Sequence, residues 1–155
     1  VRSIAHDLDV AKIMVVGVPD RPGIAASIFE ALAKAGVSVD TIVQNASINN
    51  ITDLTFTVTK SEMAKAMKVV EPIARSLGAR ECVSNARMGK VSIIGTGMQN
   101  TPGYAARMFS TLSEHGINIQ LITTSEIRIT CIIDEAQVKD AVRALHRAFQ
   151  LDAGV

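Results

Sequence analysis

The sequence has very few aromatic residues: no Trp, one Tyr and four Phe among 155 residues. Proteins that bind single-stranded nucleic acids stack bases on aromatic side chains, and their surfaces carry a clear excess of positive charge. Here 16 Lys and Arg are balanced by 15 Asp and Glu scattered along the chain, for a formal net charge of +1. These absences argue against nucleic acid as a partner.

Long apolar runs and cysteine clusters are also missing. No run approaches the about 20 apolar residues that cross a bilayer, and the first ten residues lack a secretory pattern. We therefore expect no membrane partner and a cytoplasmic location. Cys82 and Cys131 are the only cysteines and lie far apart, which predicts neither a metal site nor a disulfide framework. Both are expected to be buried as small apolar side chains.

What the sequence does contain is an internal repeat. An apolar run that ends at Gly17 matches one that ends at Gly95, 78 residues later. Three further matches are 80 residues apart: Pro22-Gly23 with Pro102-Gly103, Leu32 with Leu112, and Gly36 with Gly116. Because turn residues and apolar positions repeat together, the chain is predicted to hold two copies of one structural unit.

Each copy has the pattern of alternating strands and helices. After the Pro-Gly turn, apolar residues recur at helical spacing, a strand follows the next Gly, and a third strand and a second striped helix come after it. The segments are Ile24 to Leu32, Leu54–Val58 and Met63 to Val70 in copy one, and Tyr104 to Leu112, Ile127–Ile133 and Val138 to Phe149 in copy two. Pro72 is predicted to kink or restart its helix. The pattern indicates an α+β fold of two ferredoxin-like βαββαβ domains, with antiparallel sheets and helices on one face.

The two copies end differently. Copy one closes with a strand-like segment, Glu81–Ser84, whereas copy two has none after Phe149. The unused segment 1–6 at the start of the chain is predicted to supply the missing strand and cover an open sheet edge. The predicted domains are therefore 11–86, and 1–10 plus 87–152, with the first inserted in the second.

The loop Gly17–Gly23 is the most informative candidate site. It leaves a strand and opens onto a helix, whose free N-terminal N–H groups attract an anion such as an α-carboxylate. Asp20 could take the ammonium group of the same ligand, or it could simply cap the helix. Gln44, on a strand face with Asp40, could contact either ligand group or face solvent. The loop and strand together predict a site for a zwitterion.

No catalytic constellation is present. The Gly-Lys-Ser/Thr ending of a phosphate-binding loop is absent, and none of His6, His115 and His146 belongs to a recognisable constellation of Ser, Cys and carboxylate side chains. No catalytic residue and no metal ligand are assigned.

Four strings, namely Val39–Asn45, Lys90–Met98, Thr123–Thr130 and Ala144–Phe149, closely resemble the C-terminal regulatory region of aspartokinase, and the likeness spans nearly the whole chain. The resemblance implies tandem ACT domains that bind threonine, lysine or both, for feedback inhibition of aspartate phosphorylation in amino-acid biosynthesis. It implies that no catalytic activity and no cofactor belong to this chain, because ATP and Mg are used by the kinase domain.

The resemblance also implies partners and site residues. The partners are a second copy, the first ACT domain of one chain meeting the second of the other, and an aspartokinase catalytic domain or α subunit. The implied effector-binding residues are Asp20, Gly23, Ile24, Ala25, Ser38, Val39, Asp40 and Gln44 in the first domain, and Tyr104, Ala105, Asn118, Ile119 and Ser125 in the second. Two alternatives stay open: a free-standing ACT amino-acid sensor without a kinase, and a small ferredoxin-like phosphatase or phosphotransferase.

Overall fold

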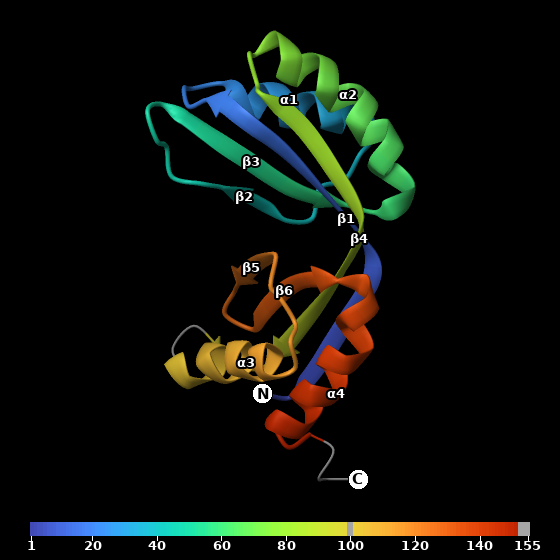
Figure 1. The fold of residues 1–155 in the computed structure, drawn as a ribbon, viewed down its shortest axis with the longest axis vertical. Coiled ribbons are helices and arrows are strands. Elements are labelled where there is room, and N and C mark those ends of the chain that lie inside the picture. The colour runs from blue at the N-terminus through green and yellow to red at the C-terminus, as the bar shows by residue number, and fades with distance from the viewer. Residues whose placement is uncertain (99–100, 152–155) are drawn as a thin grey trace. The chain divides into compact units, whose positions relative to one another are not determined.

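The computed structural model describes residues 1–98 and 101–151 (Figure 1). The chain divides into two compact units. The inserted unit is Val10–Ala86, and the split unit combines Val1–Asp9 with the described part of Arg87–Val155. Two long strands, β1 and β4, each run from one unit into the other.

The inserted unit has the strand order β2-β3-β1-β4. Strand β3 pairs antiparallel with both β1 and β2. The elements that build this unit are β1 (Ser3–Pro19), α1 (Ile24–Lys34), β2 (Ile42–Gln44), β3 (Ile51–Val58), the 3-10 turn η1 (Lys60–Glu62), α2 (Met63–Ser76) and the start of β4 (Glu81–Ile94).

Helices α1 and α2 cover one face of this sheet. Alternate residues of β1, Ala11, Ile13 and Val15, are fully buried and share a core with Leu32 of α1 and Val70 of α2. A period of two in the strand and of three to four in the helices places these apolar side chains on facing surfaces. Burial of the apolar faces stabilises the unit.

The split unit repeats this architecture with the order β1-β4-β6-β5. Strand β6 pairs antiparallel with β4 and β5, and the core contains Ile93, Met108, Cys131 and Leu145. Its remaining elements are α3 (Pro102–Glu114), β5 (Leu121–Thr124), β6 (Arg128–Asp134), the 3-10 turn η3 (Glu135–Gln137) and α4 (Val138–Ala148). The predicted fold class is confirmed, including an N-terminal strand that completes the second sheet.

A β-bulge interrupts the end of β1. The pairing register with β3 shifts between Val15 and Val18, and Gly17 within the bulge has a φ of +70°. Only glycine adopts this left-handed conformation without steric cost. Pairing with β3 resumes after the bulge at Val18 and Pro19, and the chain then enters the loop that carries Asp20.

The connection between β2 and β3 ends in a tight turn. Asn49 and Asn50 both have positive φ, 54° and 61°, and Ile48 pairs with Ile51 on either side. Two consecutive left-handed residues define a type I′ hairpin turn, and asparagine tolerates that conformation better than most residues.

One detail differs from the sequence prediction. Helix α2 runs without interruption from Met63 to Ser76 with Pro72 inside it, so the predicted restart at Pro72 is wrong. Packing of the apolar face of α2 outweighs the backbone hydrogen bond that proline removes. Within residues 1–98 and 101–151, no helix combines the length and apolar character that crossing a bilayer requires.

Candidate functional site

The loop after β1 leads directly to the N-terminus of α1. Gly23, with a φ of +92°, occupies the N-cap position, and no side chain caps the helix there. The interpretation of Asp20 as the cap is therefore wrong. The amide of Ala25, in the first helical turn, has no acceptor within the helix. The loop presents N–H groups of a helix N-terminus beside an exposed carboxylate.

Asp20 and Gln44 are brought together although 24 residues separate them. The Gln44 Nε2 donates to Asp20 Oδ1 at 3.4 Å, and both side chains are exposed. The amide of Asp20 donates to the Asn50 carbonyl at 2.8 Å, which fixes the loop against the hairpin turn. The 3.4 Å contact is long for a hydrogen bond, so it leaves the carboxylate open to a stronger cationic donor.

Ser38, Val39 and Asp40 form the approach to β2. The Ser38 amide donates to the Glu62 carboxylate at 3.2 Å, and the Asp40 amide donates to the Thr57 carbonyl at 3.0 Å. Val39 is half-buried against the core. The structure thus anchors this segment to η1 and β3.

The predicted residues of the split unit lie in different environments. Ala105 lines a cavity of about 270 Å³ at the N-terminus of α3. The Tyr104 ring packs on Phe149, with centroids 6.4 Å apart, and Ile119 also packs against the core. Asn118 and Ser125 are exposed. Tyr104 and Ile119 therefore contribute to packing whatever else they contact.

Asp53 is a residue of this region that sequence reasoning missed. Its Oδ1 accepts from the Gly17 amide at 2.9 Å, and its carbonyl accepts from the Asn45 amide at 3.3 Å. Gly17 lies three residues before Asp20, and Asn45 directly follows Gln44. Asp53 thereby connects the two chain segments that carry the candidate site. An isolated Asp inside a strand gives no sequence signal for such a role.

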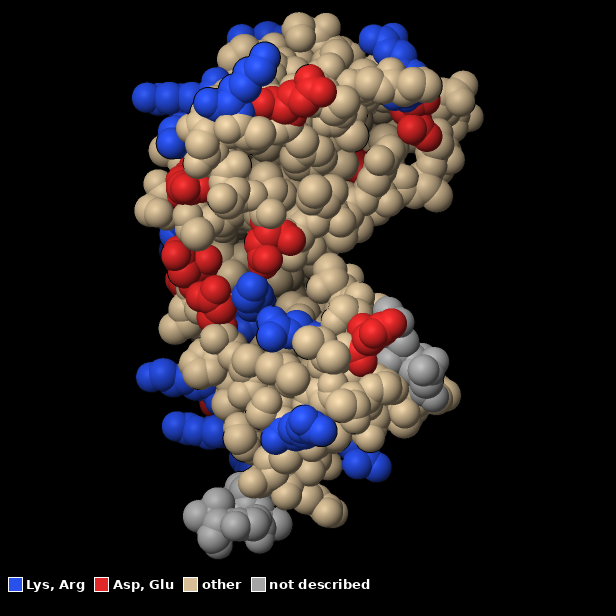
Figure 2. Space-filling model, turned by 180° about the vertical axis from the view of Figure 1, so that it is seen from behind, with Lys and Arg blue, Asp and Glu red and all other residues tan. Residues whose placement is uncertain are grey.

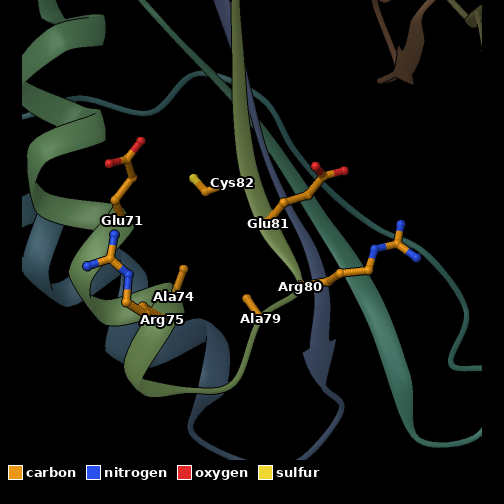
Figure 3. A pocket seen from close by; sticks show the side chains of 7 residues that line it. All are labelled: Glu71, Ala74, Arg75, Ala79, Arg80, Glu81 and Cys82. Carbon is orange, nitrogen blue, oxygen red and sulfur yellow. The ribbon is translucent and has the colours of Figure 1, made fainter.

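Cys82 borders a separate cavity of about 280 Å³ between α2 and the start of β4. Figure 3 shows its side chain on β4, across from Glu71 on α2. Burial, with a smaller contribution from the Glu71 charge, raises the pKa of Cys82 to about 11, and burial raises that of Cys131 to about 12. Both thiols are free, and both are neutral at physiological pH.

The raised pKa gives a pH dependence that alkylation can measure. At pH 8 the folded chain should react slowly with iodoacetamide at Cys82, and the rate should rise about tenfold per pH unit up to about pH 11, because the thiolate is the nucleophile. The neutral thiol's contribution to the free energy of unfolding is complete below pH 9.0, the ordinary pKa, and is lost as the pH rises toward 11. Cys82→Ala is the control for the signal of Cys131. Fast alkylation of the folded chain at pH 8 would contradict the assignment.

Neither the surface charge nor the arrangement of metal-ligating side chains indicates an ion site in the described residues. Both signs of charge are found on both units on the face seen in Figure 2. Over the described ranges, no three His, Cys, Asp or Glu side chains gather into a group that could bind a metal ion.

The structure therefore defines a tandem pair of ferredoxin-like α+β units, the inserted one with an open helix N-terminus beside the end of a strand. A family model described as an ACT domain matches residues 13–72 and again residues 91–149. The chain is therefore a pair of ACT domains.

Relatives identify the kind of pair. An aspartate kinase of Stutzerimonas stutzeri, Ask_LysC, is 46% identical over 153 residues, which cover 99% of this chain and 37% of that protein. A chain in the crystal structure of aspartokinase alpha and beta subunits is 42% identical with a TM-score of 0.89, and the match covers 96% of this chain and 97% of that one. The regulatory subunit of aspartate kinase from Thermus thermophilus, in its ligand-free form, is 41% identical with a TM-score of 0.89 over 94% and 96% of the two chains.

The chain belongs to the family of aspartokinase regulatory subunits and regions, and the resemblance noted from the sequence is confirmed. It spans 37% of the length of the curated aspartate kinase from Stutzerimonas stutzeri. The match to the regulatory subunits covers nearly all of both chains, so the matched part is the regulatory part of the enzyme and not its kinase part.

Proposed function

We propose that this chain senses the amino acids threonine, lysine or both and thereby imposes feedback inhibition on an aspartate kinase in the cytoplasm. The observation that supports this proposal is the meeting of Asp20 and Gln44 beside the N-terminus of α1. The α-carboxylate of an effector would bind the N–H groups of the first turn at Gly23 to Ala25, and its ammonium group would bind Asp20. Ser38, Val39 and Asp40 would form the adjoining wall.

Exposed isoleucines support a homodimer as the working form. Of the seven large apolar side chains that are exposed in the described residues, five belong to the two edge hairpins: Ile42, Ile48 and Ile51 in the inserted unit, and Ile122 and Ile127 in the split unit. Exposed apolar clusters of this kind mark protein interfaces. In the proposed dimer the first domain of one chain meets the second domain of its partner, and Tyr104, Ala105, Asn118, Ile119 and Ser125 contribute the second wall of the site.

The proposed mechanism is thermodynamic linkage. An effector that binds better to one arrangement of the domains shifts the population toward it, and an attached or associated kinase part responds. A coupling of about 1 to 3 kcal/mol changes affinity roughly 5- to 150-fold. ATP and Mg would act only in the kinase part, so this chain is proposed to need no cofactor.

Calorimetric titration of the chain with threonine, with lysine and with their mixture tests the proposal. Saturable binding of at least one of them supports it. If neither binds alone or in the mixture, this chain is not a sensor of these amino acids.

Asp20→Ala should weaken effector binding about 10- to 100-fold in the same titration, because one hydrogen-bonded charge contact with the ligand is lost. Glu30→Ala is the matched control, because it removes an exposed carboxylate on α1 two turns away from the N-terminus of the helix. Its affinity for the effector should equal that of the unmodified chain. An unchanged affinity in Asp20→Ala would show that the effector binds elsewhere.

A further inference from the structure

A second cavity in the inserted unit lies apart from the loop of Asp20. It has a volume of about 340 Å³ and is bordered by the bulge of β1, the β2–β3 connection and the residue before β4. Its polar side chains are Asn45, Asn49, Thr52, Asp53 and Arg80. Neither Asp20 nor Gln44 lines it. This open cavity has room for a small metabolite, since ligand sites begin at about 300 Å³.

Two opposite charges face this cavity without pairing. Asp53 is half-buried, and the only hydrogen bond that its carboxylate makes to the described part of the chain is the 2.9 Å bond from the Gly17 amide to Oδ1. The Arg80 guanidinium has no hydrogen bond or ion pair with any described residue. A carboxylate and a guanidinium that share a cavity but stay apart leave a gap that a ligand of both charges would bridge.

The backbone fixes both charged residues in place. The Arg80 amide donates to the Val16 carbonyl at 2.8 Å, so its side chain starts from the sheet and not from a free loop. Figure 3 shows that side chain extending from the start of β4 across β1 toward β3, the strand that carries Asp53. The fold therefore sets the separation of the two backbone positions, and the exposed Arg80 side chain spans the remaining distance.

We propose that this cavity is a second ligand site, for a small zwitterion of the amino-acid class. The ligand carboxylate pairs with the Arg80 guanidinium, whose planar donors match a carboxylate. The ligand ammonium pairs with the Asp53 oxygen that Gly17 leaves open. The side-chain amides of Asn45 and Asn49 offer further donors and acceptors, and Ile48 gives the ligand side chain an apolar wall.

The site is connected to the loop of Asp20 by two hydrogen bonds. Gly17, three residues before Asp20, donates to Asp53, and Asp20 itself donates to the carbonyl of Asn50, next to Asn49. A ligand in the cavity therefore restrains the same backbone that positions Asp20. Occupancy of the two sites should be coupled, in either direction by the same factor.

Amide NMR of the 15N-labelled chain tests the proposal in an Asp20→Ala background, which removes the ammonium contact of the effector loop. Glycine, L-alanine, L-threonine and L-lysine are titrated separately, and the signals of Gly17 and Arg80 report on the cavity. N-acetylated and C-amidated forms of the best ligand remove one ligand charge each. Asp53→Asn keeps an acceptor for the Gly17 amide but removes the charge, and Arg80→Gln keeps the backbone bond to Val16.

We expect saturable shifts with at least one zwitterion, and affinities about tenfold lower in each charge-removing variant and for each modified ligand. No saturable shift with any of the four up to about 10 mM would overturn the proposal. So would weakening in only one of the two variants, because bridging needs both charges. Loss of threonine and lysine binding in the Asp20→Ala titration tests only the proposed effector loop. The NMR result for the cavity can succeed or fail independently of it.

Discussion

A chain that lacks residues 1–9 is expected to lose the folded split unit while the inserted unit stays folded. The removed segment is the part of β1 that borders β4 in the split unit. The Arg2 amide donates to the Ile94 carbonyl at 2.6 Å, and Val1 and Ile4 pack against the core of that unit. Its removal exposes one edge of β4 and part of an apolar core, at about 0.5 to 1.5 kcal/mol for each backbone hydrogen bond alone.

Calorimetry with hydrogen exchange measures this outcome. Several lost bonds together approach the whole stability of a small domain, about 5 to 15 kcal/mol, so protection should disappear for α3, α4 and β6 and persist for α1, α2 and β3. A synthetic peptide of residues 1–9 added to the shortened chain is the control, and it should restore some protection. If α4 keeps its protection in the shortened chain, the N-terminal strand is not needed for the split unit.

The fold class was predictable because turn residues and core residues repeat together. Pro22-Gly23 and Pro102-Gly103 mark the start of a helix in both copies, and Gly36 and Gly116 both adopt positive φ just after one, 76° and 69°. These positions depend on local backbone geometry, which sequence records directly. A shared local geometry in the same order is sufficient to reveal a shared unit.

The length of the strands could not be predicted in the same way. Segment 6–9 of β1, His-Asp-Leu-Asp, reads as a polar break between two apolar runs, and Asn85 interrupts β4 similarly. Both lie inside continuous strands, Ser3–Pro19 and Glu81–Ile94. Neighbouring strands provide backbone partners whatever the side chains are, so tertiary pairing overrides the low strand propensity of Asp and Asn.

The residues of the candidate site also fall into two groups: those that the local sequence indicates and those that only tertiary pairing brings together. Asp20 was identifiable because a Pro-Gly turn stands directly beside it, and the structure does bring it to Gln44. The contact between Asp53 and Gly17 joins residues 36 positions apart, and Arg80 reaches the same region only through the pairing of β4. Whether the predicted residues bind an effector remains a prediction that the Asp20→Ala titration decides.

Gly89→Ala is expected to be the most damaging single-methyl change in the split unit. A Cβ at Gly89 would lie 2.5 Å from Cγ2 of Val138 and 3.3 Å from the carbonyl oxygen of Asp7. Val138 is fully buried at the start of α4, and its β-branched side chain has little rotamer freedom. The helix must therefore move away from β4, at a cost of about 1 to 3 kcal/mol for overpacking.

Gly103→Ala is the matched control, because it adds the same methyl group to α3 of the same unit and meets nothing within 4 Å. There the change should leave stability equal or raise it by up to about 1 kcal/mol, since alanine favours helix over glycine. Denaturant unfolding measures both variants. Val138→Ala makes room for the new methyl group, so its cost and that of Gly89→Ala should be less than additive in the double variant. Additive costs would show that α4 does not pack directly on Gly89. A Gly89→Ala chain as stable as the unmodified one would show the same, and would contradict the close packing of α4 on β4.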